Sequence, residues 1–347
     1  MDRSIVLATD VWGPEMLAVA EIADNNGFCR LWTTERPGRD GLIRAAEIAL
    51  STCRIGVATG IAYAFSRHPV AMAGTAAELH RLSGGRFLLG LGTGTRGMRS
   101  RWFNETFDHP APRLAEYCDL IHQVLQAEGR GCTFDGDYYK VTIPGFAIEQ
   151  TENTAGNSDL PIYGSGLNPI MLQIMTRRCD GVALHPLVGA PRYLDEIAGP
   201  AMKRGREEAV RGGCLASWLL VAINENEEEA MAAARRELAF YFTTPSYGHV
   251  AEVSGWTEDV ALLRAKFQEI GPKWDELGRF IPGGMIEDLC PTGTPSDVIA
   301  MVQERCSLLE QYGIDEVVFE PAVIGSTHRD VVASFTATAK YLGDAVA

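Results

Sequence analysis

Two carboxylates, Asp10 and Glu35, each follow a short apolar run that the residue pattern predicts to be a β-strand. Carboxylates at such positions can orient the polar edge of a bound ring or exchange a proton with it. They can equally cap a helix or order a loop, and the sequence leaves both roles open. Thr34, directly before Glu35, adds a hydroxyl at the same predicted strand end. Asp40 can cap a helix that runs to about Ser51.

A glycine-rich run is the most informative segment of the chain. Phe87–Leu91 is a nearly continuous apolar stretch, which is typical of a buried parallel strand, and Gly90, Gly92 and Gly94 alternate through its end. Glycine weakens a strand, so the alternation predicts a bulky group close to one face, whereas a tight turn would explain it without a ligand. Thr93 supplies a hydroxyl beside the bare main chain. The spacing is not the G-x-G-x-x-G of dinucleotide-binding proteins.

A second glycine loop, Gly164-Ser165-Gly166, directly precedes a helical pattern that begins near Asn168. Main-chain N–H groups at a helix start favour phosphate, although an ordinary strand-to-helix turn has the same composition. His185 stands at another predicted strand end, before Pro186. It can hydrogen-bond a phosphate or a substrate, or it can be a packed and satisfied histidine of the interior.

Strand and helix patterns alternate along the whole chain and total eight βα units, with one long strand expected over residues 54–65. This predicts a single (β/α)₈ TIM-type barrel domain over residues 1–347, with insertions at about 129–159 and 244–289. An open doubly wound sheet is the alternative. In a barrel, ligands bind at the carboxyl ends of the strands, where the side chains named above would lie.

The composition narrows the class of protein. The chain has 347 residues and a formal net charge of −14, which disfavours nucleic acid and anionic membrane as partners. Its eight cysteines show no C-x-x-C pair, so neither a zinc site nor a disulfide framework is expected. No signal peptide or membrane-spanning run is evident, which predicts a cytoplasmic protein. Nucleophile and phosphate-binding motifs such as G-x-S-x-G are missing, which indicates reactivity borrowed from an organic cofactor.

Several motifs, in order and spacing, resemble the bacterial luciferase-like oxidoreductases, and within them the branch that uses the deazaflavin coenzyme F420. The matching segments are Gly27 to Glu35, Arg39-Asp40, Arg67-His68-Pro69, Leu82 to Gly94, and Pro161 to Val182. The chain is similar in particular to methylenetetrahydromethanopterin reductase. That enzyme has a Thr-acid-His triplet where this chain has Thr34-Glu35-Arg36, and the missing histidine puts a proton-transfer role at position 36 and the pterin substrate in doubt.

The resemblance implies a non-prolyl cis peptide at Gly60-Ile61, whose bulge would support the back of the deazaflavin ring. It also implies catalytic roles around the ring for Asp10, Thr34 and Glu35. The side chain and phosphate of the cofactor would be held by Thr93, Gly94, Gly164, Ser165, Gly166 and His185.

The leading hypothesis is therefore an F420-dependent oxidoreductase that transfers hydride between the deazaflavin C5 and a small organic substrate. One alternative keeps the fold but makes the protein an FMN-dependent monooxygenase, and another makes it a flavin- or deazaflavin-binding protein without turnover. Relatives imply a homodimer. No metal ion is expected.

Overall fold

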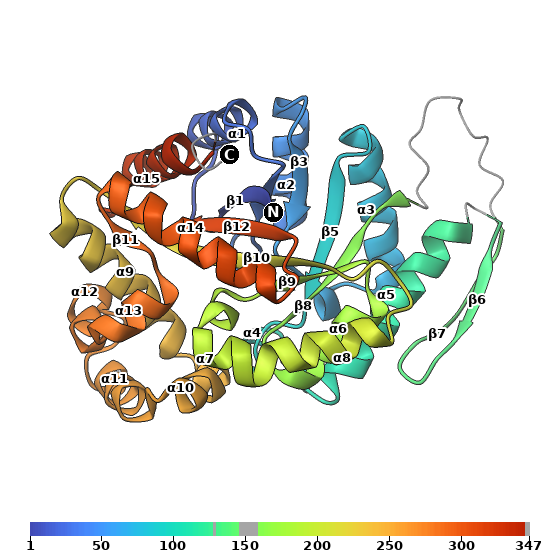
Figure 1. Ribbon diagram of the computed structural model, residues 1–347. Helices are drawn as coiled ribbons and strands as arrows, with labels where there is room; N and C mark the ends of the chain where they lie inside the picture. Colours follow the sequence, from blue (N-terminus) through green and yellow to red (C-terminus); the bar gives the residue numbers. More distant parts are fainter. Residues whose placement is uncertain (128–129, 146–158, 344–347) are drawn as a thin grey trace. The chain divides into compact units, whose positions relative to one another are not determined.

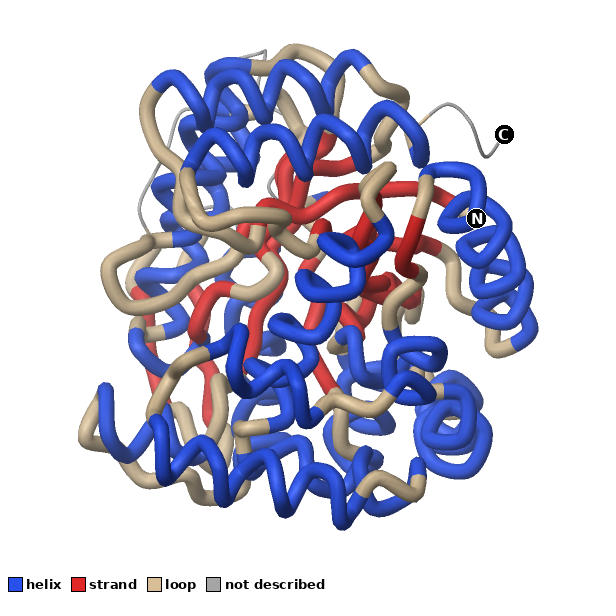
Figure 2. Tube along the Cα trace, turned by 90° about the vertical axis from the view of Figure 1, so that its left-hand side faces the viewer, coloured by secondary structure: helices blue, strands red, loops and turns tan. Residues whose placement is uncertain are grey.

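The computed structural model describes residues 1–127, 130–145 and 159–343. Contacts divide the chain into two compact units. Unit 1 consists of Met1–Cys29, Leu184–Pro200 and Ala216–Ala347, and unit 2 of Arg30–Ala183 and Ala201–Leu215. Each unit alternates strands with helices along the chain, as the trace shows in red and blue (Figure 2). The single-domain organisation stays a prediction.

Unit 2 contains a parallel sheet in the order β2-β3-β5-β8-β9. The strands are β2 Arg30–Thr33, β3 Gly56–Thr59, β5 Phe87–Gly92, β8 Ile162–Gly166 and β9 Gly181–Leu184. All six residues of β5 are buried, as expected for a parallel strand that is covered on both faces. The helices of this part are α2 Gly41–Ser51, α3 Pro69–Leu82, α4 Arg96–Trp102, α5 Pro110–Ala127, α6 Pro169–Arg178 and most of α8 Gly199–Glu207.

The long strand expected over residues 54–65 is wrong in one respect. It is divided into β3 and the two-residue β4, Ala62–Tyr63, and the peptide bond between them, Gly60-Ile61, is cis as predicted. β3 pairs with the first part of β5, while β4 pairs with its end, Ala62 opposite Leu91 and Tyr63 opposite Gly92. The pairing with β5 is therefore interrupted at the cis peptide and resumes near the carboxyl end of β5.

Arg86, directly before β5, connects several elements of unit 2 through its side chain. Its guanidinium donates hydrogen bonds to the carbonyls of Ala49, Thr52 and Ile55 at 2.6–3.0 Å. These carbonyls belong to the last turn of α2 and to the loop after it, and a helix leaves its last carbonyls without a partner inside the helix. A positive charge there also complements the helix dipole. One side chain thus fixes α2, the start of β3 and β5 together.

Unit 1 contains the order β11-β10-β12-β1. The strands are β1 Asp2–Leu7, β10 Cys214–Ile223, β11 Thr292–Gly293 and β12 Glu316–Pro321. The helices are α1 Pro14–Asn25, α7 Pro191–Tyr193, α9 Glu227–Phe242, α10 Gly248–Ser254, α11 Thr257–Ile270, α12 Trp274–Leu277, α13 Gly283–Leu289, α14 Pro295–Gln311 and α15 His328–Leu342. The first and last helices, α1 and α15, pack side by side (Figure 1).

Both predicted insertions have structure of their own. The second is a group of short helices, α10 to α13, which lies with α9 beyond the carboxyl end of β10 (Figure 1). The first includes the antiparallel hairpin of β6 Cys132–Asp135 and β7 Lys140–Ile143, which packs beside α5. The rest of that insertion, residues 146–158, lies outside the described residues. Every helix in the described ranges is too short or too polar to cross a membrane.

Candidate functional site

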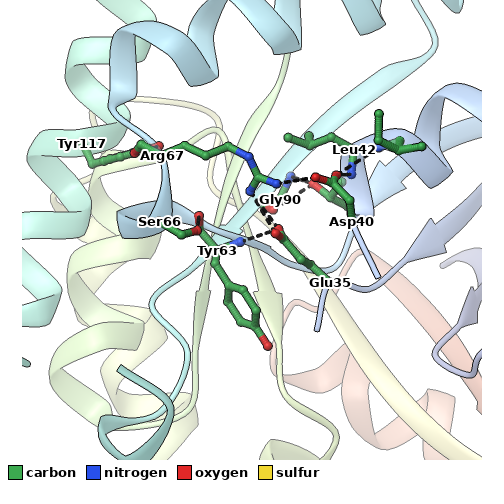
Figure 3. Close-up of polar contacts among 10 residues, drawn as sticks. Glu35, Asp40, Leu42, Tyr63, Ser66, Arg67, Gly90 and Tyr117 are labelled. Carbon is green, nitrogen blue, oxygen red and sulfur yellow. Dashed lines mark hydrogen bonds and ion pairs between the residues drawn. The ribbon is translucent and has the colours of Figure 1, made fainter. Parts of the chain in front are cut away.

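Glu35 is the centre of a hydrogen-bonded network in unit 2, at the end of β2 (Figure 3). Its Oε2 accepts a hydrogen bond from the main-chain N–H of Tyr63 at 2.9 Å, and its Oε1 accepts one from Arg67 Nη1 at 2.9 Å. Arg67 reaches on to Asp40 Oδ2 with its other terminal nitrogen, at 2.7 Å. The carboxylate and its main chain, whose N–H donates to the Ile61 carbonyl at 3.3 Å, together hold the segment that follows the cis peptide.

Burial sets the electrostatics of this network. It raises the pKa of Glu35, while the Tyr63 N–H and the positive charge of Arg67 oppose that rise. Burial and the neighbouring Glu35 charge raise the pKa of the Tyr63 phenol to about 12, so Tyr63 stays protonated. Because both oxygens of Glu35 already have partners, the structure gives this residue a positioning role. Its role as a catalytic acid stays a prediction.

The other two predicted catalytic residues lie in different surroundings. Thr34 Oγ1 accepts a hydrogen bond from Arg39 Nη2 at 2.6 Å, within unit 2. Asp10 is an exposed residue of unit 1 in the loop after β1. Asp40, in contrast, caps α2 as its position predicted, because its Oδ1 accepts from the N–H groups of Leu42 and Ile43.

The alternating glycines of β5 do make room for close neighbours, but the chain's own atoms take up that room at two of them. A Cβ at Gly90 would collide with the Thr59 carbonyl, and the Thr59 hydroxyl bonds both the N–H and the carbonyl of Gly90. A Cβ at Gly92 would lie 2.5 Å from Ser165 Oγ and 2.7 Å from Ile61 Cγ1. The expectation that these glycines face a ligand is therefore corrected, because a neighbouring strand and the residue after the cis bond approach instead.

The ends of β5 and β8 nevertheless bring hydroxyl side chains and bare glycine backbone close together. β5 and β8 are paired, with Leu91 opposite Gly164, so Thr93, Gly94 and Ser165 come from neighbouring strand ends. Gly94 has a φ of +68° and only van der Waals neighbours at its Cβ position, and Thr93 Oγ1 donates to the Gly94 carbonyl at 2.8 Å. The Ser165 hydroxyl makes no hydrogen bond within the described ranges.

The remaining predicted residues of this loop serve helix packing. A Cβ at Gly164 would collide with Met175, and one at Gly166 would press on Leu172, so both glycines let α6 approach β8 closely. The N-cap residue of α6, Asn168, makes no side-chain cap hydrogen bond, which leaves main-chain N–H groups of the first turn without that partner. Gly60 and Ile61 lie beside this site through the contact of Ile61 with Gly92.

His185 belongs to unit 1, where it follows β9 and contacts two tyrosines. Its ring lies edge-on to Tyr241 at 4.9 Å and tilted over Tyr247 at 4.4 Å. Its Nδ1 accepts the N–H of Leu187 at 3.2 Å, which leaves the proton of the neutral ring on Nε2. Burial lowers the pKa of His185 to about 3, so this ring is an uncharged hydrogen-bond donor at neutral pH.

The sequence reasoning missed several residues of these sites, among them Tyr63, Arg67 and Tyr241. Arg67 stands in a motif that was recognised, Arg67-His68-Pro69, but its partner Glu35 is 32 residues away and nothing local marks the pair. Tyr241 lies near the end of a long helix and carries no motif. In the part of the chain that the structure describes, no group of three or more His, Cys, Asp or Glu residues could hold a metal ion.

Known proteins resemble the chain over nearly its whole length. A protein described as a putative coenzyme F420-dependent oxidoreductase of Mycobacterium tuberculosis is 28% identical over 330 residues, which cover 88% of this chain and 89% of that one. The 5,10-methylenetetrahydromethanopterin reductase of Methanopyrus kandleri is 28% identical over 316 residues, 86% of each chain.

Among solved structures, the coenzyme F420 dependent tetrahydromethanopterin reductase from Methanopyrus kandleri matches with a TM-score of 0.78 at 21% identity, over 98% of this chain and 97% of that one. This likeness shows the fold and confirms the predicted (β/α)₈ barrel.

The predicted family and class of enzyme are also confirmed. The sequence pattern of the family described as luciferase-like monooxygenases matches residues 10–313. That range contains every segment on which the resemblance was based and the strand ends that carry Glu35, Ser165 and His185. The chain belongs to the luciferase-like monooxygenase family, a family of oxidoreductases.

Proposed function

We propose that this protein is a coenzyme F420-dependent oxidoreductase which moves a hydride between the deazaflavin and a small organic substrate. The observation that carries the proposal is the pairing of the β5 and β8 ends, which sets the unbonded Ser165 hydroxyl beside Gly92 and the cis peptide segment. The F420-dependent relatives described above support the choice of cofactor.

The residues present fit a cofactor that combines a flat ring with a phosphate. Ser165 can donate to a phosphate oxygen, and the first-turn N–H groups of α6 add a favourable dipole. Gly94 leaves the main chain bare beside them, with Tyr63 at 3.5 Å from the position of its missing Cβ. A hydroxyl without a partner, next to glycine backbone at a helix start, suits an anion better than it suits a packed core.

When bound, the deazaflavin would supply or accept the hydride, and the chain's own residues would position the cofactor and shield it from water. Glu35 and Arg67 hold the segment from Ile61 to Tyr63 in place. Ser165 would donate to the phosphate, and Thr93 would lie beside it with its own proton donated to the Gly94 carbonyl. His185, in unit 1, keeps an uncharged Nε2–H donor throughout the physiological range, since burial lowers its pKa to about 3.

A binding titration tests the proposal. The purified full chain is titrated with oxidised F420, reduced F420 and FMN, and the change in cofactor fluorescence gives each Kd. We expect micromolar or tighter binding of F420 and at least tenfold weaker binding of FMN. Reduced F420 is then offered a panel of enones, imines and aldehydes, and the return of the deazaflavin absorbance reports turnover. Tight FMN binding without F420 binding overturns the assignment.

The second candidate is an FMN-dependent monooxygenase fed by a separate reductase. The family whose pattern matches residues 10–313 is described as luciferase-like monooxygenases, which favours this second candidate. The two candidates differ in what consumes the reduced cofactor. Oxygen uptake that depends on reduced FMN and an organic substrate supports the monooxygenase, whereas oxygen-independent oxidation of reduced F420 supports the first proposal.

We also propose that the protein is a homodimer and that its substrate is a small molecule, because the resemblance implies both. The molar mass from light scattering during size-exclusion chromatography tests the first part, and a mass of one chain contradicts it.

A further inference from the structure

A groove of about 640 Å³ lies at the surface of unit 1. It is lined by α9, α15, the start of α14 and the segments that follow β10 and β12 (Figure 1). All of its lining residues belong to unit 1, and none of them is part of the sites described above. Its volume falls in the range of roughly 300–1,000 Å³ that is typical of pockets for small ligands. The groove therefore has room for a ligand of its own.

Small side chains on the two helices create this space. On α9 it is Ala232 that lines the groove between two longer side chains. The lining residues of α15 recur at helical spacing and therefore share one face, which consists of Asp330, Ala333, Ser334, Ala337 and Tyr341. From Asp330 to Tyr341 this face extends over about 16 Å, at about 1.5 Å per residue. The groove is therefore elongated, and Ile223 and Ile324 add to its apolar lining.

Two carboxylates of the groove have no positively charged partner. Glu225 makes no hydrogen bond or ion pair with any residue that the structure describes. Glu229 accepts one side-chain hydrogen bond at 2.9 Å, and its donor is the uncharged amide of Asn224. An ammonium group of a ligand would pair with both carboxylates through charge-assisted hydrogen bonds.

The other charged side chains of the groove already have partners. The Arg236 guanidinium donates to Asp275 Oδ1 at 2.9 Å, so its positive charge is balanced. Asp330 accepts hydrogen bonds from two main-chain N–H groups that precede α15 and serves as part of the N-terminal cap of that helix. The charge that remains uncompensated in the groove is therefore the negative charge of the two glutamates.

A buried hydroxyl in the lining indicates a second feature of the ligand. Ser334 is 8% exposed, and its Oγ accepts the main-chain N–H of Ile324 at 3.0 Å. The proton of this hydroxyl has no acceptor among the residues that the structure describes. Because buried polar groups are nearly always hydrogen-bonded, an oxygen acceptor on a ligand would complete the bonding of Ser334.

The acids at the start of α9 also have a structural role. The helix dipole favours acids in the first turn, and Glu227, Glu228 and Glu229 all lie there. Glu227 and Glu228 do not line the groove, whereas Glu225, which does, precedes the helix. The dipole therefore does not account for Glu225, and an experiment can use Glu228 to separate the two roles.

We propose that this groove binds a small organic cation. The ammonium group of the ligand pairs with Glu225 and Glu229, its apolar body lies along the alanine-lined helix faces, and an oxygen on that body accepts the proton of Ser334. The inference goes beyond the proposed function and does not rest on it, because the groove shares no residue with the proposed cofactor site.

The first test compares three probes on the unloaded full chain at neutral pH. Aminohexanol, hexanediol and hydroxyhexanoate share a six-carbon chain with a hydroxyl at one end, and carry an ammonium, a second hydroxyl or a carboxylate at the other. Ligand-observed NMR titrations give each Kd. We expect aminohexanol to bind roughly fivefold more tightly than hexanediol, and hydroxyhexanoate to bind most weakly. Equal Kd values for the three probes, or no binding of aminohexanol, overturn the proposal.

Glu225→Gln and Glu229→Gln test where the ammonium group binds. Each should raise the Kd of aminohexanol about 2–5-fold, the effect of one exposed ion pair, and leave that of hexanediol unchanged. Glu228→Gln is the matched control, because it removes the same charge from the same helix at a side chain outside the groove. If Glu228→Gln weakens aminohexanol as much as the other two variants do, the whole acidic surface attracts the cation and the assigned site is wrong.

Ser334→Ala tests the oxygen acceptor. The ratio of the hexylamine Kd to the aminohexanol Kd reports what the hydroxyl of the ligand contributes, because only aminohexanol has one. We expect this ratio to fall about 2–12-fold in Ser334→Ala, the effect of one neutral hydrogen bond. An unchanged ratio overturns the hydrogen bond from Ser334.

Ala333→Leu tests the groove itself. The larger side chain would fill space between the helices, so aminohexanol and hexanediol should both lose about tenfold or more in affinity. Thr336→Leu is the matched control, because Thr336 is exposed on the same helix and does not line the groove. Unchanged binding in Ala333→Leu overturns the proposal. A molar mass that falls to one chain in Ala333→Leu alone overturns it too, because the groove is then a contact between copies of the chain.

Discussion

The carboxylate of Glu35 accepts a hydrogen bond at 2.9 Å from the main-chain N–H of Tyr63, 28 residues further along the chain. Tyr63 is the last residue of β4, and β4 rejoins β5 directly after the cis peptide. An acid at one strand end therefore fixes the main chain of the next one. Arg67, which is 24% exposed, completes the clamp, and its charge opposes the rise in the pKa of Glu35 that burial causes.

Glu35→Gln tests whether this acid positions the segment. The amide keeps an acceptor for the Tyr63 N–H but loses the charge that Arg67 binds, so we expect the free energy of unfolding to fall by about 1–3 kcal/mol. The affinity for F420 should fall at the same time, because the segment from Ile61 to Tyr63 is held less firmly. Urea unfolding and a fluorescence titration measure the two effects.

Glu47→Gln is the control for that substitution, because Glu47 is exposed on α2 of the same unit. It should leave both quantities unchanged within about 0.5 kcal/mol. If Glu35→Gln binds F420 as the wild type does while its stability falls, the clamp supports only the fold and has no bearing on the cofactor.

Gly92→Ala tests the close approach of β5, Ile61 and Ser165. The new methyl group would lie 2.5–2.7 Å from Ser165 Oγ and Ile61 Cγ1, so one of the two must move. We expect a loss of about 1–3 kcal/mol in stability and a large loss of cofactor affinity. Gly74→Ala is the matched control: it lies in the exposed interior of α3 with nothing within 4 Å, and should stabilise the protein by about 0.5–1 kcal/mol.

Ser165→Ala tests the phosphate site by itself. The Ser165 hydroxyl makes no hydrogen bond in the described part of the chain, so its removal should leave the stability unchanged. The Kd for F420 should rise roughly 10- to 150-fold, since a hydrogen bond to a charged group contributes about 1.5–3 kcal/mol. The same titration with a deazaflavin chromophore that lacks the phosphate should show no difference between wild type and variant. An equal loss for both ligands places the hydroxyl at the ring.

The outcome at β5 shows what a sequence pattern can and cannot specify. Alternating glycines indicate positions where a Cβ does not fit, and this is true at Gly90 and Gly92. The pattern does not indicate which atom occupies the space. That atom is the Thr59 carbonyl in one case and the side chains of Ile61 and Ser165 in the other. These partners come from neighbouring strands, so their identity depends on the strand register, which the sequence does not display.

Local signals were more reliable than long-range ones. Asp40 was correctly predicted to cap α2, because capping depends on residues two and three positions away. The alternation of strands and helices predicted the barrel for a similar reason, since each unit has its own periodicity. The Tyr241–Glu320 hydrogen bond joins residues 79 positions apart across an insertion, and no spacing rule could indicate it.

The pH dependence of stability separates Glu320 and His185, two titratable groups of unit 1. Glu320 has its pKa raised from 4.5 to about 8, so the folded chain binds more protons than the unfolded chain between these values, and stability falls as pH rises. His185 has its pKa lowered from 6.5 to about 3, so the unfolded chain binds more protons in that window, and stability rises with pH. The two slopes oppose each other from pH 4.5 to 6.5.

Of these two groups, only Glu320 changes the unfolding free energy with pH above pH 6.5, so its effect can be measured there. Between pH 6.5 and pH 8 we expect the wild type to lose about 2 kcal/mol of unfolding free energy relative to Glu320→Gln, at most 1.4 kcal/mol per pH unit. Urea unfolding of both proteins at half-unit pH steps measures the difference. Parallel curves for the two proteins would mean that Glu320 is already ionised in the folded chain, in which case its buried Oε2 must have a partner such as a bound water or cation.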